Sequence, residues 1–235
     1  MSDLLQRISD HIWLFPPHPD SEAMQPGVGI VITDSATVLI DAGNSPRHAR
    51  QIRAALRQID APPVSYVIYT HHHWDHTFGA QIWTGSVAVG HEQCRNLLLE
   101  HYDGQPWNQH HGLEQGYPNP ALWLPDRTVG DWGAFRLVLP QITFTASMNL
   151  VVDDLTLALR HVGGQHAADS IIVQAGEVLF IGDCIEPPPD PSQPPGDIIA
   201  HGLIENLLGC EVNIFVDGHN GPAARADFAR RQAGP

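Results

Sequence analysis

The feature that most constrains this chain is an apolar run that ends in a cluster of histidines. Residues 64–69, Val-Ser-Tyr-Val-Ile-Tyr, are mostly β-branched or aromatic, which predicts a buried strand. The run continues directly into Thr70-His71-His72-His73-Trp74-Asp75-His76. Where a strand breaks into a loop, side chains at positions i and i+2 can turn toward one point. His71 and His73 are therefore candidate ligands of one metal ion.

Two more candidate ligands lie on the next turn of the chain. Asp75 and His76 can face a second point close to the first, so the His-x-His-x-Asp-His pattern predicts two adjacent sites for divalent metal. An accidental histidine run, or an exposed tract that binds metal loosely, is the alternative. Further candidate ligands later in the chain favour the metal sites. By this spacing His72 points away from its neighbours, so we expect His73→Ala to abolish metal binding and His72→Ala to leave it intact.

Three later residues complete the candidate set. His166 lies in a Gly-rich turn, whereas Asp183 and His219 each come directly after an apolar strand. Strand ends present side chains rigidly to one rim of a sheet, so these residues can meet the histidine cluster. Three imidazoles with one open position is the pattern of catalytic zinc. The expected first site is His71, His73 and His166, and the second is Asp75, His76 and His219, with Asp183 as a carboxylate able to bridge the two.

Composition places the chain among globular proteins with a sizeable core. It has 235 residues, of which 43% are hydrophobic and 16% charged, and it contains no apolar run long enough to span a membrane. Residues 1–7 lack the basic start and apolar core of a signal peptide. The three cysteines, Cys94, Cys184 and Cys210, are widely spaced without a Cys-x-x-Cys pair. We expect a cytoplasmic protein without disulfides.

The charge balance narrows the range of partners. Acidic residues outnumber basic ones by 26 to 12, for a formal net charge of −14. Such a field repels phosphate backbones and anionic lipids, so nucleic acids and membranes are not expected partners and a small-molecule substrate is. All twelve basic residues are arginine. The absence of lysine excludes Schiff-base chemistry and phosphate loops that depend on that side chain.

Helices and strands are expected to alternate along the chain. The Ser45-Pro46 pair predicts a helix start, and a second helix is expected from Gly90-His91, with Cys94 and His101 as packing residues. A third helix is expected near 204–208. Irregular loops are expected at 15–27, 103–125 and 186–199. The expected strands are 12–15, 28–33, 38–41, 64–69, 135–139, 142–145, 151–152 and 155–161, besides those that precede Asp183 and His219.

The apolar hairpins at 30–41 and 172–183 are similar, since each ends in an Asp before a small residue or Cys. This similarity suggests two similar halves that divide near 103–125, within one domain over residues 1–235. Two such halves predict two sheets packed face to face with helices outside.

The chain resembles the metallo-β-lactamase superfamily. The motifs that carry the resemblance are Leu-Ile-Asp-Ala-Gly at 39–43, His-x-His-x-Asp-His at 71–76, Gly-x-His at 164–166, Gly-Asp at 182–183 and Asp-Gly-His at 217–219. The resemblance implies an α+β fold, a four-layer αββα sandwich of two mixed β-sheets flanked by helices, with a metal pair at one edge. It also implies that Asp41 supports the metal ligands from behind. The expected cofactors are two divalent ions, Zn²⁺ first, with Mn²⁺ or Fe²⁺ as alternatives.

Within that superfamily, the carboxylate of Asp183 makes this chain more similar to glyoxalase II, lactonase and related hydrolases than to the β-lactamases that have Cys at this position. The turn at His166 departs from the glyoxalase II pattern, and the 16 residues after His219 are too few for that enzyme's helical substrate domain. We expect hydrolysis of a lactone, a thioester or a β-lactam-like amide by a hydroxide that bridges two metal ions. Asp75 is the expected catalytic residue, orienting the nucleophile or carrying a proton to the leaving group.

Two alternatives remain. In one, the same residues hold a single iron for oxygen chemistry, as in relatives of persulfide dioxygenase. In the other, the chain binds metal without catalysis. Metal content, oxygen consumption and hydrolysis of a substrate panel distinguish the three.

Overall fold

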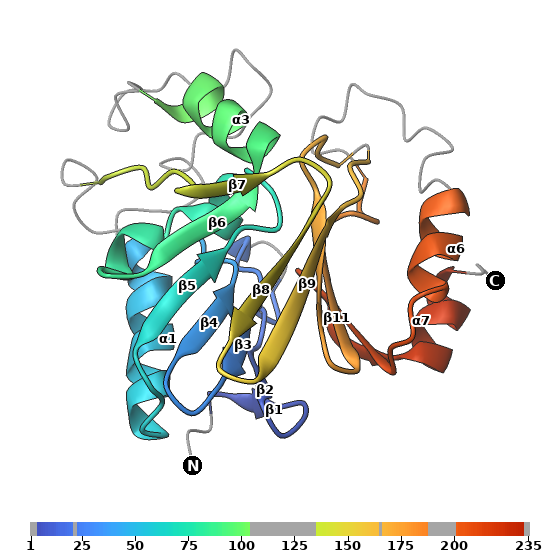
Figure 1. Cartoon of the computed structure of the whole chain (residues 1–235), viewed down its shortest axis with the longest axis horizontal. Helices are drawn as coiled ribbons and strands as arrows, with labels where there is room; N and C mark the ends of the chain where they lie inside the picture. The colour runs from blue at the N-terminus through green and yellow to red at the C-terminus, as the bar shows by residue number, and fades with distance from the viewer. Residues whose placement is uncertain (1–3, 21–22, 104–134, 165, 188–200, 233–235) are drawn as a thin grey trace.

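The computed structural model describes residues 4–20, 23–103, 135–164, 166–187 and 201–232. Two β-sheets lie face to face, and helices cover the outer side of each sheet (Figure 1). The expected four-layer αββα sandwich is therefore confirmed. The expected loop at 103–125 lies almost wholly outside the described residues, as does most of the loop at 186–199.

The first sheet has seven strands in chain order, antiparallel from β1 to β4 and parallel from β4 to β7. A parallel pair requires a crossover connection, and a helix supplies it between β4 and β5 and again between β6 and β7. The strands are β1 (Gln6–Arg7), β2 (Ile12–Phe15), β3 (Val28–Ile32), β4 (Thr37–Ile40), β5 (Val64–Ile68), β6 (Val87–His91) and β7 (Ile142–Phe144).

Helix α1 (Pro46–Gln58) begins as its sequence predicts. The Ser45 hydroxyl accepts a hydrogen bond from the His48 N–H at 3.2 Å, and Pro46 occupies the first turn, where its missing N–H costs nothing. The face with Ile52 and Leu56 packs on the first sheet. Helix α3 (Glu92–Tyr102) buries Cys94 on the same side of that sheet.

Within the described residues the second sheet has six strands, in the order β13-β12-β11-β10-β9-β8, of which only β11 and β12 run parallel. Helices α6 (His201–Leu208) and α7 (Arg225–Gln232) cover its outer face (Figure 1). The chain passes from the first sheet to the second after β7. The strands are β8 (Ser147–Val152), β9 (Leu155–His161), β10 (Ile171–Ala175), β11 (Val178–Gly182), β12 (Ile214–Asp217) and β13 (Gly221–Ala224).

The core has three layers of buried side chains, one between each pair of structural layers. One lies between α1, α3 and the first sheet, one between the two sheets, and one between the second sheet and its helices. Fully buried aliphatic side chains such as Ile30, Leu157 and Ile181 each stabilise the fold by about 1.5–3 kcal/mol relative to exposure. The central layer holds the two sheets together, and with them the strand ends that carry the candidate ligands.

The strand predicted at 135–139 is wrong, because this segment is irregular. Phe135 is buried against Phe78, with ring centroids 4.7 Å apart, so its apolar character reflects side-chain packing rather than strand pairing. The carbonyl of Val138 accepts a hydrogen bond from the Tyr69 hydroxyl at 2.9 Å. This bond takes the place of the one that a neighbouring strand would supply. The helix expected from Gly90-His91 begins one residue later, because β6, which was not predicted, runs to His91.

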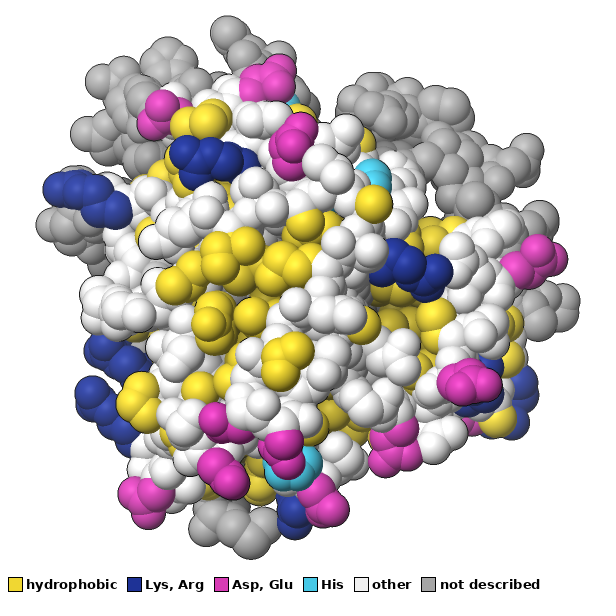
Figure 2. Space-filling model, in the orientation of Figure 1, with side chains coloured by type: hydrophobic (Ala, Val, Ile, Leu, Met, Phe, Trp, Pro, Cys, Tyr) yellow, Lys and Arg dark blue, Asp and Glu magenta, His cyan; other side chains and the backbone are white. Residues whose placement is uncertain are grey.

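Figure 2 shows one face of the molecule, where hydrophobic side chains gather in the middle and acidic side chains gather at the lower margin. Among the large exposed hydrophobic residues are Ile142 and Val151, on the edge strands β7 and β8. In the described part of the chain, no helix combines the length and apolar character needed to cross a membrane.

Candidate metal centre

The candidate ligands all follow strand ends on the same edge of the two sheets. His71, His73, Asp75 and His76 follow β5, His166 lies between β9 and β10, Asp183 follows β11 and His219 follows β12. The structure brings these seven residues into two adjacent groups. Within each group, the ligand atoms lie within 4.8 Å of one another. The groups are His71, His73 and His166, termed the first cluster, and Asp75, His76, Asp183 and His219, termed the second cluster.

The first cluster consists of three ring nitrogens that face one another. Nδ1 of His73 lies 2.9 Å from Nε2 of His71 and 3.0 Å from Nε2 of His166. The Pro187 carbonyl accepts a hydrogen bond from His166 Nδ1 at 2.9 Å, so the neutral ring presents a bare Nε2 to the cluster. Burial holds the pKa values of His71 and His73 well below 6.5, which keeps both rings neutral. Neutral imidazoles are the form that binds a metal ion.

The second cluster combines two imidazoles with two carboxylates. Oδ2 of Asp183 lies 3.2 Å from Nε2 of both His76 and His219, and Asp75 Oδ2 lies 3.3 Å from His219 Nε2. Burial opposes protonation of the two rings, but the carboxylates outweigh it. Asp183, Asp75 and Asp41 hold the pKa of His76 well above 6.5, and Asp183 and Asp75 raise the pKa of His219 to about 10.

Asp183, a member of the second cluster, also faces the first. Its Oδ2 is also 3.5 Å from Nε2 of His166, which belongs to the first cluster. Burial alone would raise the pKa of Asp183, but the adjacent His76 and His219 lower it well below 3.8. Its Oδ1 is buried and has no hydrogen-bond partner among the described residues. A buried carboxylate oxygen without a donor is costly unless a cation compensates it.

Asp41 supports His76 from the side away from the cluster. The Asp41 carboxylate accepts from the Thr70 N–H and from His76 Nδ1, both at 2.8 Å, so Nδ1 of His76 is the donor to Asp41 and Nε2 is the nitrogen that faces Asp183. Asp41 adopts a left-handed backbone conformation with φ 68°. Asp tolerates this region better than most residues, which explains a carboxylate at the turn after β4.

A tight turn presents His219. Asp217 Oδ1 accepts from the N–H groups of His219 and Asn220 at 2.8 and 2.9 Å, and the Gly218 carbonyl accepts from the Gly27 N–H at 2.7 Å. Gly218 has no room for a side chain, because a Cβ there would overlap Asp183 Oδ1. The His219 side chain is 28% exposed, more than the 9% of His166. His219 is therefore more accessible to solvent than the ligands of the first cluster.

These observations together fit divalent cations. The first cluster offers three nitrogen ligands and the second two nitrogens and two carboxylates, which suit Zn²⁺, Mn²⁺ or Fe²⁺. Neither an arginine nor a lysine is among the described residues that the ion pairs place against Asp183 or Asp75. Cations at the two clusters would balance this buried negative charge.

His72 lies outside both clusters, as its position in the motif predicts. Its Nδ1 is instead 2.8 Å from Oδ1 of Asp169, a residue that sequence reasoning missed. The signal was weak, because nothing local indicates a partner 97 residues away. His72 is buried, so His72→Ala removes a buried contact, and its expected retention of metal stays a prediction. His101 stacks on His72 at 5.4 Å, and Cys184 packs in the apolar layer under α6 and α7 rather than at the clusters.

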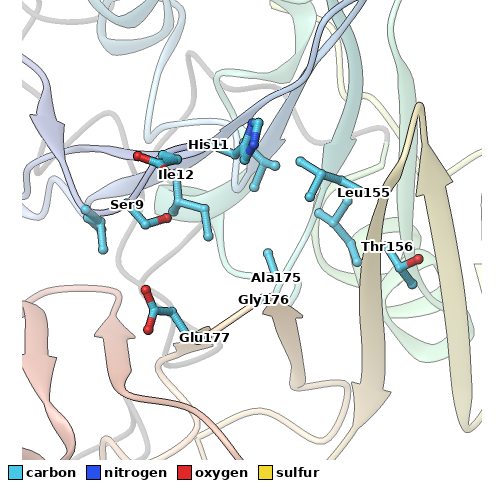
Figure 3. Close-up of a pocket in the computed structure, with 12 residues that line it drawn as sticks. Ser9, His11, Ile12, Leu155, Thr156, Ala175, Gly176 and Glu177 are labelled. Carbon is cyan, nitrogen blue, oxygen red and sulfur yellow. The ribbon is translucent and has the colours of Figure 1, made fainter.

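A separate cavity of about 480 Å³ lies at the opposite end of the sandwich, where β11 begins (Figure 3). Its walls are mainly aliphatic, and Ser9, His11, Thr156 and Glu177 supply polar groups. None of the seven candidate ligands lines it, so the candidate chemistry is confined to the other end of the sheets.

The αββα sandwich is the hydrolase-type fold of the metallo-β-lactamases. The His/Asp residues at one edge of its sheets form a metal-binding cluster. A family model described as the metallo-beta-lactamase superfamily matches residues 25–223. The chain therefore belongs to the metallo-β-lactamase superfamily, most of whose members are metal-dependent hydrolases.

Solved structures agree on the fold. A metallo-beta-lactamase from Pontibacter korlensis is 16% identical with a TM-score of 0.65, over 97% of this chain and 96% of that one. A metallo-beta-lactamase from Erythrobacter litoralis is 18% identical with a TM-score of 0.63, over 96% and 92%. A double mutant of the sec-alkyl sulfatase PisA1 is 16% identical with a TM-score of 0.70, but this chain spans 41% of its length. Comparison with curated proteins gives no match.

Proposed function

We propose that this chain is a dinuclear metallo-hydrolase that cleaves a small acyl substrate, such as a lactone, a thioester or a β-lactam-like amide. One observation carries the proposal: Asp183 Oδ2 lies within 3.5 Å of ring nitrogens from both clusters, so one carboxylate is shared between them. Membership of a superfamily consisting mostly of metal-dependent hydrolases supports it. The proposed cofactors are two divalent ions, Zn²⁺ first.

The first cluster would hold one ion and the second cluster the other, with Asp183 between them. Two bound divalent ions would supply a Lewis acid for the scissile carbonyl and an acidified water as the nucleophile. Around them, the buried side chains of His71, His76 and Asp183 exclude bulk water. Exclusion of water strengthens the electrostatic interactions within the site.

Asp75 is the residue proposed to handle the proton. Its Oδ2 lies 3.3 Å from His219 Nε2, at the more exposed side of the centre, where a substrate can enter. From there the carboxylate can hold the proton of the nucleophile and pass it to the leaving group. His219 and His76 both lie beside Oδ2 of Asp75, and these two contacts fix the orientation of the Asp75 carboxylate.

The partner that we propose is a small molecule rather than a nucleic acid or a membrane. The net charge of −14 supports this, because it repels both. A cytoplasmic location is part of the same proposal, and it is supported by three free cysteines, two of them buried.

The test is elemental analysis of protein purified without added metal, paired with a panel of lactones, thioesters and β-lactams. We expect two divalent ions per chain, with hydrolysis lost on chelation and restored by Zn²⁺. Stoichiometric iron with oxygen consumption and sulfite formed from a persulfide would replace the hydrolase by a dioxygenase. Bound metal without turnover of any substrate would make the chain a non-catalytic metal-binding protein.

A further inference from the structure

A buried acid–imidazole pair lies directly behind the first cluster. Asp169 is fully buried and His72 is 3% exposed, and their Oδ1 and Nδ1 atoms are 2.8 Å apart. Neither belongs to the two groups of candidate ligands. A carboxylate and an imidazole buried together are costly to separate, because each would be left without its partner in a dry interior.

The pair joins the two segments that supply every ligand of the first cluster. His72 stands between His71 and His73 in the chain, and its Nδ1 faces Asp169, whereas the ring nitrogens of His71 and His73 face each other. Asp169 is three residues after His166. One hydrogen bond therefore connects the segment with two of the three imidazoles to the segment with the third.

The surroundings of the pair are rigid. The Ile171 N–H donates to the Thr70 carbonyl at 2.8 Å, which ties the start of β10 to the end of β5 beside the pair. Within the loop, the Ser170 hydroxyl donates to the Ala167 carbonyl at 2.8 Å, and His161 Nε2 donates to the Ala168 carbonyl at 2.8 Å. These hydrogen bonds hold the loop in one conformation, so the position of Asp169 also fixes the position of His166.

The other side of the pair is also packed. The His101 ring stacks on His72 with an interplanar angle of 23°. The Cys94 thiol lies against Asp169, and burial together with that carboxylate keeps the pKa of Cys94 well above 9.0, so the thiol stays protonated and can donate to it. His72 is therefore fixed in both direction and tilt.

We propose that Asp169 and His72 are positioning residues that set the spacing of His71, His73 and His166, and so determine how tightly the first cluster holds its ion. They touch neither the ion nor the substrate. The inference rests on the proposed function, because it assumes that the first cluster binds a metal ion. It adds that the motif's central histidine, which is not a ligand, is part of the metal site.

The experiment compares His72→Phe, Asp169→Leu and Asp169→Asn with the wild-type chain. His72→Phe keeps a buried ring but loses the Nδ1 donor, and Asp169→Leu keeps the branched shape but loses the acceptor. Asp169→Asn keeps an acceptor oxygen and is the conservative rescue. Each protein is stripped of metal and titrated with Zn²⁺ against a chelator, and the ions that remain after dialysis are counted. Thermal unfolding of the metal-free proteins is measured in parallel.

We expect His72→Phe and Asp169→Leu to bind one of the two ions about 10–100-fold more weakly, as is typical when the outer partner of a metal site is lost. Asp169→Asn should remain close to the wild type. His219→Ala, which removes a ligand of the second cluster, should lose the other ion, and His72→Phe combined with His219→Ala should bind a single ion with the weakened affinity. Asp153→Asn is the control, because Asp153 also bonds across loops, to Ser35 at 2.8 Å, but is not a candidate ligand.

The outcomes separate this inference from the function it rests on. A wild-type chain that binds no divalent ion refutes both. Two ions in the wild type, with both retained at unchanged affinity in His72→Phe and Asp169→Leu, refute the positioning role alone. The same follows if both ions weaken equally, or if weakening only tracks a lower unfolding temperature of the metal-free protein.

Discussion

Replacing Asp41 with Asn should weaken the binding of the ion held by the second cluster. The Asp41 carboxylate accepts from the Thr70 N–H and from His76 Nδ1, both at 2.8 Å. An amide has one acceptor oxygen, so if that oxygen serves Thr70, the NH₂ group faces His76 Nδ1. His76 must then carry its proton on Nε2, the atom that lies 3.2 Å from Asp183. A protonated nitrogen cannot bind a metal ion.

The magnitude follows from the loss of one outer partner of a ligand. Such losses weaken metal affinity by about 10–100-fold, which corresponds to roughly 1.4–2.7 kcal/mol. The metal-free protein should also lose roughly 1 kcal/mol of stability, because the hydrogen bond of His76 to a carboxylate becomes a weaker one to a neutral amide. The backbone is not disturbed, since Asp41 has φ 68° and Asn tolerates the left-handed region as well as Asp does.

The assay is a chelator-competition titration with Zn²⁺, together with denaturant unfolding of the metal-free protein. Asp60→Asn is a matched control, because Asp60 also has a positive φ, 53°, but is exposed and is not a candidate ligand. The control should bind both ions like the wild type. If Asp41→Asn binds two ions with unchanged affinity, His76 does not depend on Asp41 for its tautomer and the reasoning is refuted.

Four further predictions follow from the same structure. His73→Ala should lose the ion of the first cluster and hydrolysis together while circular dichroism shows the fold intact, and unchanged metal content would contradict the ligand assignment. Burial lowers the pKa of His48 to about 3, so below pH 6.5 the unfolded chain binds a proton that the folded chain does not. The free energy of unfolding should therefore fall with decreasing pH by up to about 1.4 kcal/mol per pH unit. His48→Phe should reduce this slope in urea titrations between pH 4 and 6. Gly218→Ala should displace Asp183 and cost an ion in the dialysis assay, whereas Gly202→Ala, in an open position on α6, should stabilise the protein by up to about 1 kcal/mol. Chelation should lower the melting temperature by roughly 10–20 °C if both ions were present at about a hundred times their dissociation constants, and an unchanged melting curve would argue against bound metal in the folded state.

Local sequence was sufficient for most of the fold. The Ser45-Pro46 pair predicts the start of α1 because capping and proline geometry are properties of neighbouring residues. The segment at 135–139 was misassigned because an apolar run has the same appearance whether its backbone pairs with a strand or its side chains enter a core. There the Tyr69 hydroxyl, rather than a neighbouring strand, satisfies the Val138 carbonyl.

What the sequence by itself determined is the chemistry available to the protein: which imidazoles and carboxylates follow strands, at what spacing, and without any lysine. That information is local, since the strand period and the turn residues are set by adjacent positions. Only the tertiary structure decided which of these groups meet. Asp183 lies between His166 and His76, and Asp169 pairs with His72, because the two sheets bring residues far apart in the chain to one edge. A contact between segments 97 residues apart depends on how the whole core packs, and no window of the sequence encodes it.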